Sequence, residues 1–134
     1  MKLFAAVSML SLCAVIMACA TTSPPLAVTA SVDAAAAKHN AEGIEHFNMG
    51  HWDAAKGHFE AAVKADPKLA EPHYNLALAL HKLGAHGEAT AHLKEAAELA
   101  PTNSAITGSG TYQHHVSPPP SAGGGYGYGG MGGY

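Results

Sequence analysis

Apolar residues recur at three- and four-residue steps in four stretches of the chain between residues 36 and 103, which is the spacing of amphipathic helices. Gly50 divides the first two stretches and Gly84 divides the last two. Each glycine can supply the left-handed residue that ends a helix. Each pair of stretches then stops at a proline, Pro67 or Pro101, because the residue before proline is pushed out of the α region. The pattern predicts two helical hairpins.

The two hairpins are copies of one another, since Pro67 and Pro101 lie 34 residues apart and the windows 36–69 and 70–103 align without a gap. Self-similarity at a fixed period is typical of repeat architectures. The sequence therefore predicts an all-α protein built from stacked helix-turn-helix units. The identical pairs are Ala36 and Ala70, His39 and His73, Gly50 and Gly84, Ala55 and Ala89, His58 and His92, Ala62 and Ala96, and Pro67 and Pro101.

Small residues indicate how the helices of each hairpin pack. Gly43 and Ala55 allow two backbones to approach closely, and Phe59 is large enough to fill the space beside them. A larger residue at this seam is expected to overpack it, at a cost of about 1–3 kcal/mol. The equivalent residues of the second hairpin are Ala77, Ala89 and Leu93.

The region from Ala36 to Asn103 resembles two tetratricopeptide repeats. The family's glycine, alanine, aromatic and proline positions fall on Gly43, Ala55, Phe59 and Pro67 in the first window. Histidines stand where the family has a tryptophan, at His39 and His73. The resemblance covers about half of the chain and implies a protein-interaction scaffold rather than an enzyme. In the second window the matching residues are Leu76, Ala77, Ala89, Leu93 and Pro101.

In proteins of this family, the first helices of successive repeats line a concave groove that binds an extended peptide or a helix. Phe47, Tyr74 and Leu78 would supply apolar contacts there, while amides and Lys82 would bond the peptide backbone or a carboxylate. Carried over by position, the groove comprises Asn40, Ile44, Phe47, Asn48, Tyr74, Leu78, His81 and Lys82.

No third repeat or capping helix is predicted after Pro101, because the following residues are few and interrupted by glycine. Residues 33–103 are therefore the predicted domain, and 104–134 a disordered tail ending in a glycine- and tyrosine-rich run. The outer face of the last helix, with Leu93, Ala97 and Leu99, is expected to lack a cover. An uncovered apolar face predicts self-association or a partner, and a homo-oligomer is one expected outcome.

The N-terminus predicts export. Lys2 precedes an apolar run that is short for a membrane span, so residues 1–18 fit a signal peptide. The run ends in Ile16-Met17-Ala18-Cys19, which resembles a bacterial lipobox and implies lipidation of Cys19. Residues 19–32 would then tether the domain to a membrane of the cell envelope, facing the periplasm. Cleavage at an ordinary A-x-A site is the alternative, and it would leave a soluble periplasmic or secreted protein.

Charge and motifs narrow the function. Without residues 1–18 the chain has six lysines, ten acidic residues and no arginine. Nucleic acid is therefore an unsuitable partner, because neither a basic field nor a guanidinium group is available. A nucleophile elbow, a phosphate-binding loop and a zinc-protease helix motif are all missing from the sequence, so no catalytic residue is assigned.

Histidine is unusually frequent, with ten in the chain. The alternative function is a histidine-rich periplasmic protein that binds zinc, copper or nickel, since neutral imidazole is a common ligand for all three metals. Repeat-equivalent histidines, His39 with His73 and His58 with His92, are expected to come close across neighbouring helices. The competing interpretation is that the histidines fill surface and half-buried positions.

Overall fold

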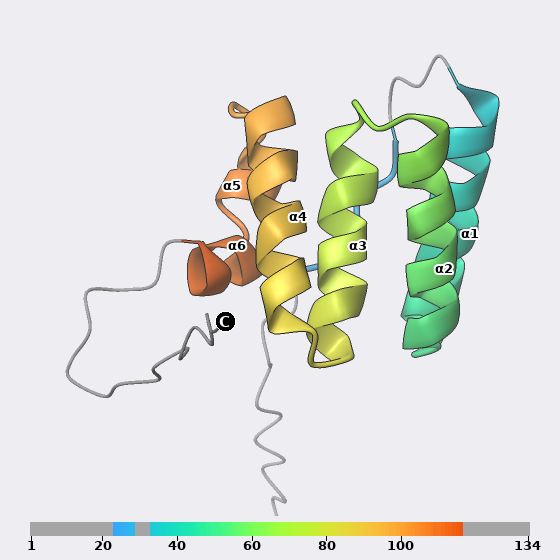
Figure 1. Cartoon of the computed structure of the whole chain (residues 1–134), viewed down its shortest axis with the longest axis horizontal. Coiled ribbons are helices and arrows are strands. Elements are labelled where there is room, and N and C mark those ends of the chain that lie inside the picture. Colours follow the sequence, from blue (N-terminus) through green and yellow to red (C-terminus); the bar gives the residue numbers. More distant parts are fainter. Residues whose placement is uncertain (1–22, 29–32, 117–134) are drawn as a thin grey trace, which may run out of the picture.

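The computed structural model describes residues 23–28 and 33–116, and within them every regular element is a helix (Figure 1). The all-α prediction is confirmed. The predicted signal peptide, Cys19 and the tail from residue 117 onward lie outside the described residues. Within the described part, no helix combines the length and apolar character that crossing a bilayer requires. The helices are α1 (Ala34–Asn48), α2 (Trp52–Ala65), α3 (Ala70–Lys82), α4 (His86–Leu99), α5 (Ser104–Thr107) and α6 (Gly110–His115).

Helices α1 and α2 form one antiparallel hairpin and α3 and α4 form the second, and the two pack side by side (Figure 1). Gly50 and Gly84 have φ angles of 79° and 81°, the left-handed conformation predicted for them. Beyond Gly50, the His51 N–H donates a hydrogen bond of 2.9 Å to the His46 carbonyl. This bond closes a Schellman turn and satisfies a carbonyl that the end of α1 would leave unpaired. The same turn recurs at Gly84.

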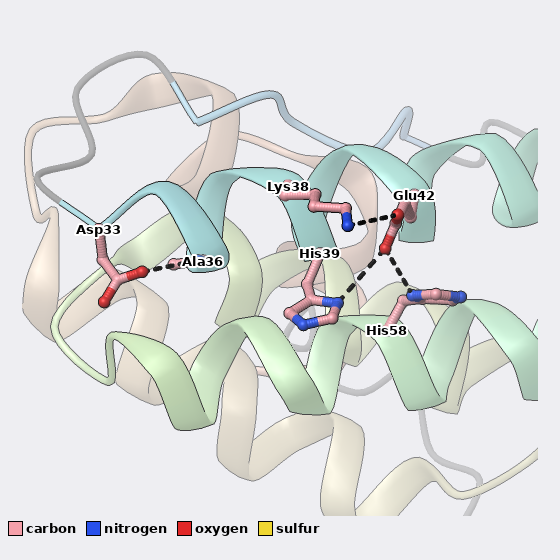
Figure 2. Close-up of polar contacts among 6 residues, drawn as sticks. All are labelled: Asp33, Ala36, Lys38, His39, Glu42 and His58. Carbon is pink, nitrogen blue, oxygen red and sulfur yellow. Dashed lines mark hydrogen bonds and ion pairs between the residues drawn. The ribbon is translucent and has the colours of Figure 1, made fainter.

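The start of α1 is fixed by Asp33. Its Oδ1 accepts hydrogen bonds from the backbone N–H groups of Ala35 and Ala36, at 2.7 and 3.1 Å, and Figure 2 shows the second of these. An aspartate in this position satisfies donors that the first helical turn leaves without partners. The predicted stop of α2 is also present, because Asp66 is extended immediately before Pro67.

The seam of the first hairpin is as close as its small residues predict. The ring of Phe59 lies directly on Gly43, where a Cβ atom would come within 2.5 Å of Phe59 Cε1. In the second hairpin, Ala77 and Leu93 are both fully buried. Helix α3 lies centrally, and each of its residues from 72 to 80 is buried.

The prediction that the last helix lacks a cover is wrong, because α5 and α6 pack against α4. Ile106 of α5 is fully buried in the common core, and Tyr112 and Val116 pack on that core. Leu93 is fully buried, and Ala97 and Leu99 are half-buried. The domain therefore extends to at least residue 116, and the expected self-association loses the observation on which it depended.

The sequence between Pro101 and residue 116 folds because polar caps and one glycine allow two very short helices. Asn103 Oδ1 accepts from the Ala105 N–H at 3.1 Å, and Ser109 Oγ accepts from the Tyr112 N–H at 3.1 Å. Between the helices, the Gly108 N–H donates to the Ser104 carbonyl at 2.9 Å. A Cβ at Gly108 would lie 2.7 Å from that carbonyl oxygen. Gly108, which interrupts the helical pattern of the sequence, is thus needed for the turn between α5 and α6.

Candidate peptide-binding groove

An extended segment of the chain itself, residues 23–28, crosses the first helices of the two hairpins. Figure 1 shows this segment, in blue, passing behind α3. Its anchor is Leu26, whose side chain packs against the hydrophobic core. Pro24 and Ala27, by contrast, are exposed. The segment therefore lies where an extended peptide ligand would lie in the groove implied by the family resemblance.

Two buried amides hold the backbone of Leu26. The Leu26 N–H donates to Asn75 Oδ1 at 2.6 Å, and the Leu26 carbonyl accepts from Asn75 Nδ2 at 2.7 Å and from Asn40 Nδ2 at 3.0 Å. Asn75 Nδ2 also donates to Asn40 Oδ1 at 2.8 Å, which locks the two side chains together. Both amides are almost completely buried, with 1% of Asn40 and none of Asn75 exposed. We call this pair the Asn40–Asn75 clamp.

The clamp recognises main chain rather than side chain. Each peptide unit offers one N–H donor and one carbonyl acceptor, and the clamp pairs with both at a single residue. Buried amides without such partners would cost about 1–3 kcal/mol each. The hydrogen bonds of the clamp thus use only main-chain atoms of Leu26, whose side chain adds an apolar contact with the core.

The predicted groove residues divide into those near the segment and those used elsewhere. Asn40 bonds the segment directly. Tyr74 and Leu78 are buried in the core, so they present almost no surface to a second ligand. Ile44 packs half-buried against the same core, whereas Asn48 is exposed. A role for these residues in binding a partner stays a prediction.

The remaining three predicted residues lie at the turn ends of the hairpins. Phe47 makes an edge-on contact with Trp52, with ring centroids 4.9 Å apart. Lys82 Nζ lies 5.6 Å from the centroid of the Trp52 ring, within the range of a cation–π interaction. His81 lies beside His115 of α6. These contacts join helices to one another, and none of them involves residues 23–28.

Asn75 and the bound segment were not predicted from the sequence. Asn75 stands in an apolar run of α3 where every neighbour is buried, and a buried amide requires hydrogen-bond partners. An asparagine in a buried apolar run therefore indicates a hydrogen-bonding role, and this is the sequence signal that points to Asn75. The small, proline-bearing composition of residues 23–28 predicts a tether, but a Pro-Pro pair also favours the extended backbone that the clamp accepts.

The four repeat-equivalent histidines pair within each hairpin, which corrects the expectation that they would pair between repeats. His39 and His58 have ring centroids 6.0 Å apart, and His73 Nδ1 lies 3.1 Å from His92 Nδ1. The reason is the antiparallel geometry: His39 precedes Met49 of the turn by ten residues, and His58 follows it by nine. Residues equally far from a turn lie level with one another, whereas repeat-equivalent residues lie one hairpin apart.

Glu42 joins the first histidine pair. Its Oε2 lies 3.3 Å from the Nδ1 atoms of both His39 and His58, and its Oε1 lies 3.8 Å from Lys38 Nζ (Figure 2). Between about a third and three quarters of each of these four side chains is exposed. The carboxylate therefore already has a lysine and two imidazoles as neighbours. In the second hairpin, burial and the neighbouring His73 lower the pKa of His92.

Comparison with protein families supports the resemblance. The model of the family Tetratricopeptide repeat matches residues 40–104, which include most of both hairpins. The search of curated proteins gave no match. The match and the paired hairpins together support a tetratricopeptide-repeat protein, a class that generally acts through protein–protein interaction and not through catalysis.

Proposed function

We propose that this protein is an envelope-anchored interaction module whose groove binds an extended peptide through the Asn40–Asn75 clamp. The observation that carries the proposal is the clamp's engagement of both backbone groups of Leu26. The chain's own segment acts as a resident ligand. A partner would present an extended stretch with a leucine-sized apolar side chain at the clamped residue.

The resident segment sets the affinity that a partner must overcome. Only residues 29–32 separate it from Asp33, the cap of α1. A short connection of this kind gives an effective concentration in the millimolar range. A partner in trans therefore competes successfully only if it is locally concentrated or makes contacts beyond those of residues 23–28. The segment would therefore exclude partners whose affinity for the groove is too low to displace it.

A peptide-binding experiment tests the clamp. Leu26→Pro removes the N–H that donates to Asn75 and should release the segment, so a labelled peptide with the sequence of residues 20–31 should bind this variant at least about tenfold more tightly than the wild type. Ala27→Pro is the matched control, because residue 27 is exposed and the described clamp bonds do not use its N–H.

The clamp itself is tested in the Leu26→Pro background. Asn75→Ala should reduce peptide affinity at least about tenfold, since it removes bonds to both backbone groups. Asn48→Ala removes an exposed amide from the same helix as Asn40 and should have no effect. Equal peptide affinity in the Asn75→Ala and Asn48→Ala variants would refute the proposal, as would failure of the peptide to bind any variant.

The membrane anchor is a second part of the proposal and rests on the lipobox-like residues Ile16 to Cys19. If Cys19 carries lipid, residues 20–22 alone separate it from the segment, a reach of about 10 Å when extended. Cys19→Ser should shift the protein from the membrane to the soluble fraction and remove the lipid mass from its N-terminal peptide. Cys13→Ser, within the predicted signal peptide, should change neither. A wild-type protein recovered in the soluble fraction without lipid would favour the alternative of ordinary signal cleavage, and a membrane-bound Cys19→Ser variant would indicate another anchor.

A further inference from the structure

The three histidines His81, His86 and His115 converge from three different helices on the side of the molecule where α6 packs. His81 lies in the last turn of α3, His86 begins α4, and His115 ends α6. One ligand atom from each can be chosen so that all three lie within 4.8 Å of one another. The His81 and His115 rings are perpendicular with centroids 4.9 Å apart, and His86 stacks on His115 at 5.4 Å.

Hydrogen bonds fix which nitrogen of His115 faces the cluster. Thr90 Oγ1 donates to the His86 carbonyl at 2.8 Å, so its single proton is used and it accepts from His115 Nδ1–H at 3.2 Å. The lone pair of His115 then lies on Nε2, which is 2.8 Å from His81 Nδ1. A hydrogen bond that orients the ring of a ligand histidine and fixes its tautomer is the usual outer-sphere arrangement of metal sites.

His81 and His115 are both half-buried, and each lies beside other histidines. Burial, followed by the neighbouring His81, His114 and His86, lowers the pKa of His115 to about 4. Burial, with His86, His114 and Lys82, lowers the pKa of His81 as well.

We propose that His81, His86 and His115 bind a divalent transition-metal ion of the zinc class and that the ion staples α6 to the second hairpin. Three imidazoles with a water in the fourth position form a recognised tetrahedral arrangement, in which ligand nitrogens lie about 3.4 Å apart. His81 Nδ1 and His115 Nε2 lie 2.8 Å apart, and one nitrogen of each of the three rings lies within 4.8 Å of the others, so the rings would rotate to reach the tetrahedral spacing. His81 Nδ1–H donates to His115 Nε2 in the metal-free protein, so metal binding would move the His81 proton to Nε2 and free Nδ1 for the ion.

This site differs from the histidine set expected from the sequence. The group of His39, Glu42 and His58 also brings three ligand atoms together among the described residues. There, however, the Glu42 contacts with Lys38 and two histidines already account for the arrangement. At His81, His86 and His115, all three ligand atoms are imidazole nitrogens, and a hydroxyl orients one ring.

Titration of the purified, tag-free protein with Zn²⁺ tests the site by calorimetry at pH 7.5. One ion should bind per chain with micromolar affinity or better. His86→Ala removes a ligand from an exposed position and should preserve the fold while reducing affinity at least tenfold. His115→Ala should have the same effect. The double variant His39→Ala, His58→Ala should bind as the wild type does.

A structural measurement distinguishes an ion that fixes α6 to the second hairpin from adventitious binding. Saturating Zn²⁺ should raise the melting temperature of the wild type and slow amide exchange in α6, with neither change in His86→Ala. The proposal is overturned if no saturable binding at one ion per chain is found, or if affinity survives in His86→Ala and His115→Ala. Loss of affinity only in the His39 and His58 double variant would assign the metal to the other group.

Discussion

Gly43→Ala is the most discriminating test of the packing that forms the first hairpin. In an ordinary helix interior, replacing glycine by alanine stabilises the helix by up to about 1 kcal/mol. At Gly43 the added methyl would lie 2.5, 2.6 and 3.0 Å from three atoms of the Phe59 ring. Contacts this short force the ring or the helix to move, and Phe59 has no exposed surface toward which to move.

The size of the effect follows from two opposing terms. Overpacking of a well-filled core costs about 1–3 kcal/mol. The full helix-propensity gain of about 1 kcal/mol would offset part of this cost and leave a net loss of about 0–2 kcal/mol. Gly57 provides the matched control, because it lies in the interior of α2 and a Cβ atom added there would meet nothing within 4 Å. Gly57→Ala should therefore show the propensity gain alone.

The comparison is made by urea unfolding of the wild type and both variants, followed by circular dichroism. Gly43→Ala should be less stable than Gly57→Ala by about 1–3 kcal/mol, the overpacking term alone, since the propensity term is common to both. In a domain of this size, that difference corresponds to a gap of roughly 4–20 °C in melting temperature. Equal stability of the two variants would refute the close seam between α1 and α2.

Three further changes test the rest of the domain. Ile106→Ala should cost about 2–4 kcal/mol in urea unfolding, since Ile106 is fully buried, and a loss below about 0.5 kcal/mol would mean that α5 does not cover α4. Tyr74→Phe removes a buried hydroxyl that bonds none of the described residues, so stability should stay level or rise by up to about 1 kcal/mol, and a clear loss would reveal a missing partner. Metal-free protein should lose stability as pH falls from about 6.5 to about 4, because His115 stays neutral when folded but takes up a proton when unfolded. Solvent screening limits the loss of unfolding free energy to about 1–2 kcal/mol. His115→Gln should flatten this dependence of stability on pH.

The hairpins could be predicted because their determinants are local and repeated. A glycine at each turn, a proline after each second helix and small residues at the seam each have a direct conformational meaning. The structure bears out these features at Gly50, Gly84 and Gly43. The repeat supplies the same information twice, so a departure in one copy does not obscure the pattern.

The end of the domain and the clamp depend on contacts that no local pattern encodes. Helices α5 and α6 are too short to show a period, and their stability comes from burying Ile106 and from the caps Asn103 and Ser109. The Asn40–Asn75 clamp joins residues 35 positions apart to a third residue 49 positions from Asn75. Such a juxtaposition becomes visible only once the hairpins are stacked.

If the proposed peptide binding and lipid anchor are both correct, the position of the clamped segment would couple one to the other. While Leu26 is clamped, residues 20–22 alone would connect the domain to a lipidated Cys19, but release of the segment would free residues 20–32. A flexible chain of that length has a root-mean-square span of about 20 Å, so the domain would move away from the membrane. Trp52, the single tryptophan, can report this change through quenching by a probe placed in the lipid headgroups of vesicles. A competing peptide should lower the quenching in the lipidated wild type, and Leu26→Pro should show the low value without peptide. Unchanged quenching despite demonstrated peptide binding would show that the segment does not control the distance to the membrane.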